Sequence, residues 1–278
     1  MSKFALIGFP LGHSISGVIH KAGFESLGVN ADYEILETPP DDLVSRLKYL
    51  KTQDYSGFNV TIPLKLPISL FVNSVDRYAD LARAVNTVKI EADKTMSAYN
   101  TDVIGFRKSI EDVSLYNKKA GILGTGGAAH AAAVAMSEMN VKEIVFFTRN
   151  IPNSIDTMNY MRRKLPDITF NVYQIERISS LEDYAILVNA TPVGMLGKAA
   201  DMKPVYYNTL STMNKDAVVF DLIYNPRKTL LLQDAQSLGL KTVNGLDMLI
   251  YQAAAAQEIW LGKKPDVKAM KIAALEAI

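Results

Sequence analysis

Polar side chains that could take part in chemistry lie at the end of the predicted strand GFNVTIPLK, residues 57–65. Apolar residues alternate with Asn59 and Thr61, so one face of the strand is buried and the other presents an amide beside a hydroxyl. Pro63 ends the strand, and Lys65 follows at the junction with the next segment. From the residues alone, Lys65 is either solvated or directed into a cleft.

Two serines two residues apart could bind an anion where a helix begins. The loop PLGHSIS, residues 10–16, places Ser14 and Ser16 before a predicted helix, so both hydroxyls can face one side beside the helix N-terminus. Such a site suits a carboxylate. The alternative is that Ser16 only caps the helix.

Amide and acidic residues at two further strand ends could line the same site. The segment AVNTV supplies Asn86, and YNTD supplies Asn100, Thr101 and Asp102. Single Asn or Asp residues at strand ends are usually turn formers, so the spacing alone assigns them no function.

A glycine-rich turn in ILGTGGAAHAAA, residues 122–133, follows a predicted strand and opens a predicted helix. In this context backbone N–H groups and a helix N-terminus can approach a pyrophosphate. Gly124 and Gly126 take the first two positions of the dinucleotide pattern, Ala129 takes the third, and Gly127 allows another close approach. The alternative is a tight strand-to-helix turn without a ligand.

The strand that follows ends in FFTRN, residues 146–150, with Arg149 near its end. At about 20 residues after the glycines, an acidic residue would hold the ribose hydroxyls of NAD, whereas an arginine would accept the 2′-phosphate of NADP. An exposed arginine at a strand end is common by itself, but together with the glycine turn it favours NADP.

The elements that must position these residues form two series. Residues 3–100 alternate short β-rich runs with helix-periodic segments, which predicts an α/β unit. The later runs KKAGILG, KEIVFFT, ITFNVY, AILVNAT, AVVFDLI and LKTVNG are almost continuously apolar, as expected for a parallel sheet buried on both faces in a doubly wound domain.

The chain ends in two helical segments that have no strands of their own to pack on within the second series. We expect them to return to the first domain. The expected domains are therefore residues 1–101 with 247–278, and residues 102–246.

Composition favours a small-molecule partner. The chain has 278 residues, enough for two domains, and 30 basic against 29 acidic residues indicate neither a nucleic-acid nor a membrane partner. Cysteine is absent, which excludes thiol chemistry and fits the cytoplasm, and the three histidines lack a metal-ligand pattern. The apolar runs near the N-terminus and in the Ala-rich segment are too short for a signal peptide or a membrane span.

Eight motifs together resemble the shikimate dehydrogenase family, in its order and spacing: IGFPLGHSIS, GFNVTIPLK, AVNTV, YNTDVIGF, GTGGAA, NATPVGM, DLIYNPRKT and GLDMLIYQAA. The similarity runs from residue 5 to about residue 262. It implies an N-terminal α/β substrate domain completed by the C-terminal helices and a Rossmann-like NADP-binding domain. The implied activity is the reversible NADPH-dependent reduction of 3-dehydroshikimate to shikimate.

The resemblance also implies a role for individual residues. Lys65 and Asp102 would be the catalytic pair, with no metal. The substrate shikimate would contact Ser14, Ser16, Asn59, Thr61, Asn86, Tyr224 and Gln252. NADP would contact Gly124, Gly126, Gly127, Ala128, Thr148, Arg149, Thr191, Leu222, Gly245 and Met248.

Several residues depart from the family pattern. Gly17, Lys21 and Gln257 stand where proline, asparagine and phenylalanine are common, and Asn153 stands where a second basic residue often assists Arg149. The alternatives are therefore a relative that acts on quinate and one that accepts NAD. The sequence does not distinguish a monomer from a homodimer.

Two alternatives lie outside the dehydrogenases. A hydrolase built on Ser14 would need a second glycine and a strand-turn-helix context that GHSIS lacks. A non-catalytic dinucleotide sensor would be expected to lose Lys65 or Asp102, both of which the chain keeps.

Overall fold

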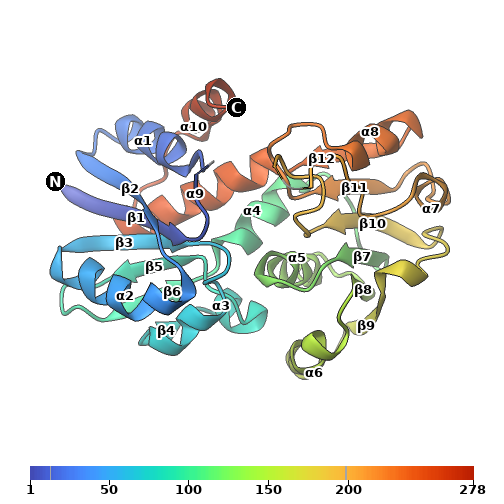
Figure 1. Cartoon of the computed structure of the whole chain (residues 1–278), viewed down its shortest axis with the longest axis horizontal. Coiled ribbons are helices and arrows are strands. Elements are labelled where there is room, and N and C mark those ends of the chain that lie inside the picture. The colour runs from blue at the N-terminus through green and yellow to red at the C-terminus, as the bar shows by residue number, and fades with distance from the viewer. Residues whose placement is uncertain (13, 198) are drawn as a thin grey trace. The chain divides into compact units, whose positions relative to one another are not determined.

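The chain forms two compact units, shown in a computed structural model that describes residues 1–12, 14–197 and 199–278. The first unit is Met1–Gly105 with Ile250–Ile278, and the second is Phe106–Leu249 (Figure 1). The divisions fall inside helices α4 (Thr101–Ser109) and α9 (Leu246–Leu261). One histidine considered above, His13, lies outside the described residues.

The first unit is built on a mixed sheet in the order β2-β1-β3-β5-β6-β4. Strands β2, β1 and β3 are parallel, β3, β5 and β6 pair antiparallel, and β4 is parallel to β6. The strands span Ser2–Gly8 (β1), Ala31–Glu37 (β2), Tyr55–Val60 (β3), Ser74–Val75 (β4), Thr87–Ile90 (β5) and Met96–Tyr99 (β6).

Successive residues of β1 serve the two faces of this sheet, as strand geometry requires. Ala5 and Ile7 belong to a core shared with α2 and α3, whereas Phe4 belongs to a core shared with α1 and α9. The helices span Ser16–Ser26 (α1), Leu43–Thr52 (α2), Arg77–Ala82 (α3) and Val267–Glu276 (α10), with short 3₁₀ turns η1 (Pro40–Asp42) and η2 (Pro67–Phe71).

The C-terminal helices pack back on the first unit, as the sequence predicted. The Trp260 ring of α9 stacks on Phe4 at 4.5 Å between ring centroids, and its Nε1–H donates to the Val88 carbonyl of β5 at 3.0 Å. Helix α10 contacts α1. The C-terminal helices therefore complete the core that the N-terminal strands and helices of the first unit build.

The second unit is a parallel sheet in the order β12-β11-β10-β7-β8-β9. The four central strands, β11, β10, β7 and β8, are buried almost throughout, and every residue of β8 after Glu143 is buried. The edge strands β9 and β12 are partly exposed, although their sequences were expected to be buried on both faces. The strands span Lys119–Leu123 (β7), Glu143–Thr148 (β8), Thr169–Gln174 (β9), Tyr184–Asn189 (β10), Val218–Asp221 (β11) and Lys241–Asn244 (β12). The predicted α/β fold class, with a Rossmann-like second sheet, is confirmed.

The connections of the second unit are helical. They span Gly127–Ser137 (α5), Pro152–Ser154 (η3), Ile155–Lys164 (α6), Ile175–Arg177 (η4), Tyr207–Leu210 (α7) and Leu230–Ser237 (α8). None of the helices formed by the described residues is long and apolar enough to cross a membrane.

Candidate active site

The strand directions of the first unit bring most of the predicted site residues to one edge of its sheet. Parallel strands β1 and β3 both end at this edge, antiparallel β5 begins there, and β6 ends there. The residues next to these ends are Ser14, Ser16, Thr61, Lys65, Asn86 and Asp102.

Lys65 and Asp102 form an ion pair at this edge, between the lysine Nζ and the carboxylate Oδ2. Only 14% of the lysine side chain and 7% of the aspartate side chain are exposed. Lys65 is therefore directed to a buried carboxylate rather than solvated. Because solvent screens a buried pair weakly, the ammonium group is held in place more firmly than at the surface.

Asn86 holds the other oxygen of the same carboxylate. Its Nδ2 donates to Asp102 Oδ1 at 2.9 Å and to Thr101 Oγ1 at 2.9 Å, and it approaches Gln252 Oε1 at 3.3 Å. Its Oδ1 accepts the Thr101 backbone N–H at 2.7 Å. The carboxylate therefore has a fixed orientation, with Lys65 on one oxygen and Asn86 on the other.

Asn59 and Thr87 extend this network across the sheet. Asn59 Nδ2 donates to the Asn86 carbonyl at 3.2 Å and to Thr87 Oγ1 at 3.0 Å. Thr87 Oγ1 in turn donates to Asn86 Oδ1 at 3.1 Å. Three predicted site residues, Asn59, Asn86 and Gln252, thus join the Lys65–Asp102 pair in one buried network.

Ser14 and Ser16 contact each other at the start of α1. Ser14 Oγ donates to Ser16 Oγ at 3.1 Å and accepts the Ser16 N–H at 3.3 Å. The helix begins at Ser16, and the N-cap position belongs to Ile15. Ser16 is therefore the first residue of α1 and not its N-cap.

Thr61 lies beside the loop that carries the two serines. The Phe9 N–H donates to the Ile62 carbonyl at 2.9 Å, which ties the chain after β1 to the chain after β3. A Cβ at Gly8 would lie 2.5 Å from Thr61 Cγ2, so glycine is needed for this close approach.

The glycine-rich turn of the second unit has the backbone that a phosphate site requires. Gly124 has φ +100°, which favours glycine, and Gly126 is the N-cap of the eleven-residue helix α5. A Cβ at Gly126 would meet nothing within 4 Å. The N–H groups of Gly127 and Ala128 lie in the first turn, where helices leave donors unpaired. This turn fits a dinucleotide phosphate.

Other predicted cofactor residues lie where two glycines of this unit are closely packed. A Cβ at Gly124 would lie 3.2 Å from Thr191 Cγ2, and a Cβ at Gly245 would lie 2.1 Å from the Leu222 carbonyl. Met248, which follows Gly245 in the sequence, is buried in the first turn of α9.

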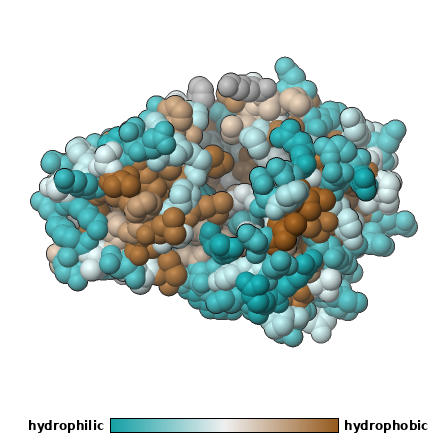
Figure 2. Space-filling view, turned by 60° about the horizontal axis from the view of Figure 1, so that its bottom comes forward, coloured by the Kyte–Doolittle hydropathy of each residue, from teal (hydrophilic) through white to brown (hydrophobic). Residues whose placement is uncertain are grey.

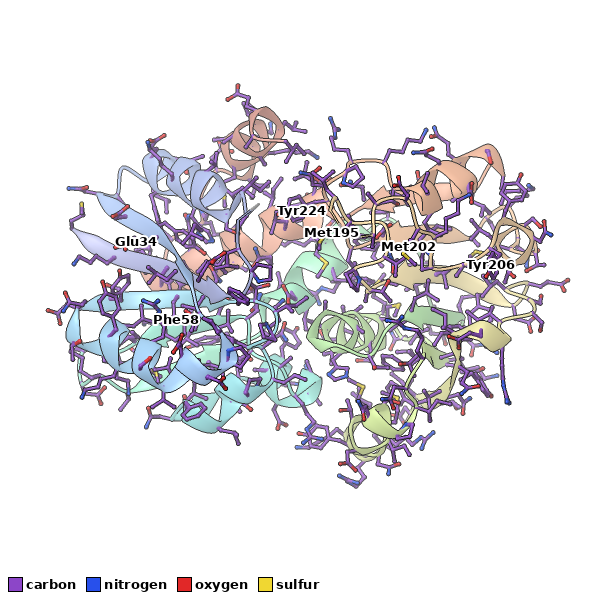
Figure 3. All side chains as sticks on the ribbon, viewed as in Figure 1. Glu34, Phe58, Met195, Met202, Tyr206 and Tyr224 are labelled. Carbon is purple, nitrogen blue, oxygen red and sulfur yellow. The ribbon has the colours of Figure 1, made fainter. Side chains whose placement is uncertain are left out.

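The remaining predicted residues follow strand ends. Arg149 is exposed directly after β8, and Thr148 Oγ1 accepts the Asn150 N–H at 3.2 Å. Tyr224, predicted as a substrate residue, belongs to the second unit and lies on the loop after β11 (Figure 3).

Sequence reasoning missed a buried carboxylate in the second unit. Asp221 accepts hydrogen bonds from Asn189 Nδ2 at 3.0 Å and Thr229 Oγ1 at 2.6 Å, and burial raises its pKa to about 6. Asn189 Oδ1 accepts from the N–H and the hydroxyl of Thr191. The signal was an Asp at the end of an apolar strand, beside a second strand that ends in Asn.

Two family models match the ends of the chain. One, described as the shikimate dehydrogenase substrate binding domain, matches residues 6–88. The other, described as the shikimate 5′-dehydrogenase C-terminal domain, matches residues 245–275.

Full-length relatives are also known. A shikimate dehydrogenase (NADP(+)) of Methanococcus maripaludis is 39% identical over 96% of this chain and 94% of its own. A crystal structure of a shikimate dehydrogenase in complex with NADP+ has a TM-score of 0.90 and 35% identity, covering 100% of this chain and 96% of its own. A Thermus thermophilus shikimate 5-dehydrogenase, in complex with NADP(H) and shikimate, has a TM-score of 0.86 and 30% identity, with 100% of both chains covered.

Fold, site and relatives define the class of this protein, an α/β oxidoreductase with a Rossmann-like second unit. The chain belongs to the shikimate dehydrogenase family.

Proposed function

We propose that this chain is an NADP-dependent dehydrogenase that reversibly reduces 3-dehydroshikimate to shikimate, a step of aromatic amino-acid biosynthesis. The observation that carries the proposal is the contact between Lys65 and the buried, doubly held carboxylate of Asp102. We assign substrate binding to the first unit and dinucleotide binding to the second.

Reduction of a ketone requires a hydride and a proton donor for the carbonyl oxygen, and NADPH supplies the hydride when it is bound. Lys65 donates the proton to the carbonyl oxygen, and the neutral amine accepts it in the oxidation of shikimate. Asp102 orients the lysine and accepts a hydrogen bond from a substrate hydroxyl. Because Asn86 holds its second oxygen, the carboxylate keeps one orientation through the proton transfer.

We assign the substrate carboxylate to Ser14 and Ser16, whose hydroxyls lie at the N-terminus of α1, where backbone N–H groups also favour an anion. Residues that offer amides and hydroxyls would bind the ring hydroxyls of the substrate: Asn59, Thr61, Asn86, Tyr224 and Gln252. Asn86 and Gln252 are already within the network that reaches Asp102.

For the cofactor, the open Gly126 position and the start of α5 support phosphate binding at Gly124, Gly126, Gly127 and Ala128. Arg149, with Thr148 beside it, would bind the 2′-phosphate as a bidentate guanidinium. Thr191, Leu222, Gly245 and Met248 would line the nicotinamide side.

We further propose a cytoplasmic enzyme that is a monomer or a homodimer. The cysteine-free sequence suits a reducing compartment. Apolar side chains remain on the surface, and Leu70 is 81% exposed. Figure 2 shows brown, hydrophobic areas among the hydrophilic ones on one face. They do not by themselves decide between the two oligomeric states.

The test follows the absorbance of the reduced cofactor while shikimate or quinate is offered with NADP+ or NAD+. We expect the highest kcat/KM for shikimate with NADP+. Quinate or NAD+ giving an equal or higher kcat/KM would contradict the proposal and favour the alternative relative within the family.

The same assay tests Arg149. Arg149→Ala should raise the KM for NADP+ about 10- to 100-fold, as expected for a lost hydrogen bond between charged groups, and leave the KM for NAD+ nearly unchanged. Arg163→Ala is the matched control, because Arg163 is an exposed arginine of the same unit at the end of α6. An equal effect on both cofactors would remove Arg149 from the phosphate site.

A further inference from the structure

A line of hydrogen bonds leads from Tyr33 on β2 toward the Lys65–Asp102 pair. The Tyr33 hydroxyl donates to Asn59 Oδ1 at 2.7 Å. Burial raises the pKa of Tyr33 well above its ordinary value, so the hydroxyl keeps its proton and acts as a donor throughout the working range of an enzyme.

This bond determines which way the Asn59 amide faces. With Oδ1 turned to Tyr33, Nδ2 directs both of its hydrogens to the Asn86 carbonyl and Thr87 Oγ1. The reversed amide would set its oxygen against the Asn86 carbonyl, where two acceptors would face each other. Asn59 is buried, so water cannot compensate for a wrong orientation.

Asn86 links the oriented Asn59 amide to the Asp102 carboxylate. Asn59 holds its backbone carbonyl, Thr87 holds its side-chain oxygen, and its Nδ2 reaches Asp102 Oδ1. A shift of Asn86 would therefore change the orientation of the carboxylate that holds Lys65.

The ring of Tyr33 makes a second contact, with His20. The His20 ring stacks on Tyr33 with centroids 4.2 Å apart and planes 8° from parallel. Gln257 of α9 holds His20, because its Nε2 donates to the His20 carbonyl at 2.8 Å and lies 3.1 Å from Nδ1. Burial lowers the pKa of His20 to about 3, so the ring packs as a neutral aromatic.

We propose that Tyr33 is a positioning residue for the Lys65–Asp102 pair and acts through Asn59 and Asn86. This inference rests on the roles assigned to Lys65 and Asp102 under the proposed function. It also gives a role to Gln257, which departs from the family pattern: Gln257 holds the His20 ring that stacks on Tyr33.

Tyr33→Phe tests the proposal, because it removes the hydroxyl and keeps the ring that His20 stacks on. Tyr55→Phe is the matched control: Tyr55 is also a tyrosine of this sheet, and its hydroxyl donates at 2.7 Å to Glu34 (labelled in Figure 3), outside the network. We expect Tyr33→Phe to lower kcat about 5- to 20-fold and to change the KM for shikimate less than about twofold, whereas Tyr55→Phe changes neither.

A double variant tests whether Tyr33 acts through Asn59. In the Asn59→Ala background, Tyr33→Phe should lower kcat by less than about twofold further, because its partner is already gone. Two effects that multiply in full would overturn the proposal. So would a Tyr33→Phe variant that matches Tyr55→Phe, or one that raises KM with kcat unchanged.

A readout independent of turnover separates this inference from the proposed function. The side-chain amide signals of Asn86 in the NMR spectrum should shift in Tyr33→Phe and stay in place in Tyr55→Phe. Unshifted signals overturn the positioning role even in an active enzyme. Wild-type protein that leaves shikimate and NADP+ unreacted contradicts the proposed function instead, and shifted signals then still support the line from Tyr33 to Asn86.

Discussion

Lys65 differs from a surface lysine in the burial of its partner. The pair formed by Lys94 Nζ and Asp54 Oδ1, at 2.5 Å, has 47% and 83% of its side chains exposed, whereas Asp102 is almost covered. Lys65→Ala should lower kcat by about 10²- to 10⁴-fold, the usual contribution of a positioned acid, with the KM for shikimate nearly retained. Lys94→Ala is the control and should leave both constants unchanged.

The two members of the pair should act as a unit. Asp102→Asn should resemble Lys65→Ala, and the double variant should be little worse than either single variant, because both residues serve one proton transfer. A Lys65→Ala enzyme that keeps its turnover and loses affinity would make Lys65 a binding residue.

His20 makes the stability of the first unit sensitive to acid. Its pKa is lowered from 6.5 to about 3 by burial. Below pH 6.5 the imidazole is therefore protonated in the unfolded chain but stays neutral in the folded chain. The free energy of unfolding is therefore not reduced by His20 above pH 6.5, and it decreases as the pH falls below that value. Between pH 7 and pH 5 the loss amounts to about 2 kcal/mol.

Urea unfolding at the two pH values measures this loss. The double variant His20→Phe with Gln257→Leu removes the titrating ring together with the polar side chain that contacts its Nδ1. The wild type should lose about 2 kcal/mol more than this variant between pH 7 and pH 5. Asp221, with a raised pKa of about 6, acts in the opposite direction but is present in both proteins. Equal losses would show that His20 titrates normally.

The sequence indicated residue types more readily than partners. Lys65, Asp102, Asn86 and Gln252 were identified from motifs, and they do share one network. Tyr33 and Thr87 were missed, because their contacts with Asn59 span 26 and 28 positions of the chain. Such contacts depend on which strands pair and in which register, and local patterns carry little of that information.

At the scale of elements, the contact between strand β3 and helix α9 leaves no room for a side chain at Gly57. A Cβ there would lie 2.5 Å from Trp260 Nε1 and 2.7 Å from the Val88 carbonyl. Gly57→Ala should therefore cost about 3 kcal/mol of stability, because ring and strand must both move.

Gly17→Ala provides the control, since the nearest atom to its Cβ would be Ile35 Cδ1 at 4.0 Å, in ordinary contact. In helix α1 this change should be neutral or stabilise by up to about 1 kcal/mol. Urea unfolding of both variants checks the difference. If Gly57→Ala is as stable as Gly17→Ala, the contact between β3 and α9 is looser than its geometry indicates.

Element type was predicted better for the second sheet than for the first. Near-continuous apolar runs such as EIVFFT identify strands buried on both faces, and β8 is such a strand. The antiparallel pairing of β5 with β6 and the two-residue strand β4 were not predicted. A two-residue strand has no periodicity to detect, and the direction of pairing depends on partners distant in sequence.

At the scale of the whole molecule, each unit has its own core, so a ligand should stabilise the unit that binds it. The first core includes residues of β1, β3 and α2, and the second includes residues of β7, β10 and α8. A ligand that binds only the folded state adds about 2.7 kcal/mol at 100 times its Kd, which slows opening-limited amide exchange about 100-fold.

Hydrogen exchange followed by mass spectrometry can therefore test the proposed division between the two units. NADP+ alone should slow exchange most in peptides of the second unit that contain the glycine-rich turn and the end of β8. Shikimate alone should slow exchange most in peptides of the first unit that contain the start of α1, the end of β3 and the start of β5. NAD+ at the same concentration as NADP+ should protect the second unit less, since Arg149 would lack its phosphate. Shikimate that protects mainly the peptides of β7 to β9 would contradict the assignment of substrate binding to the first unit.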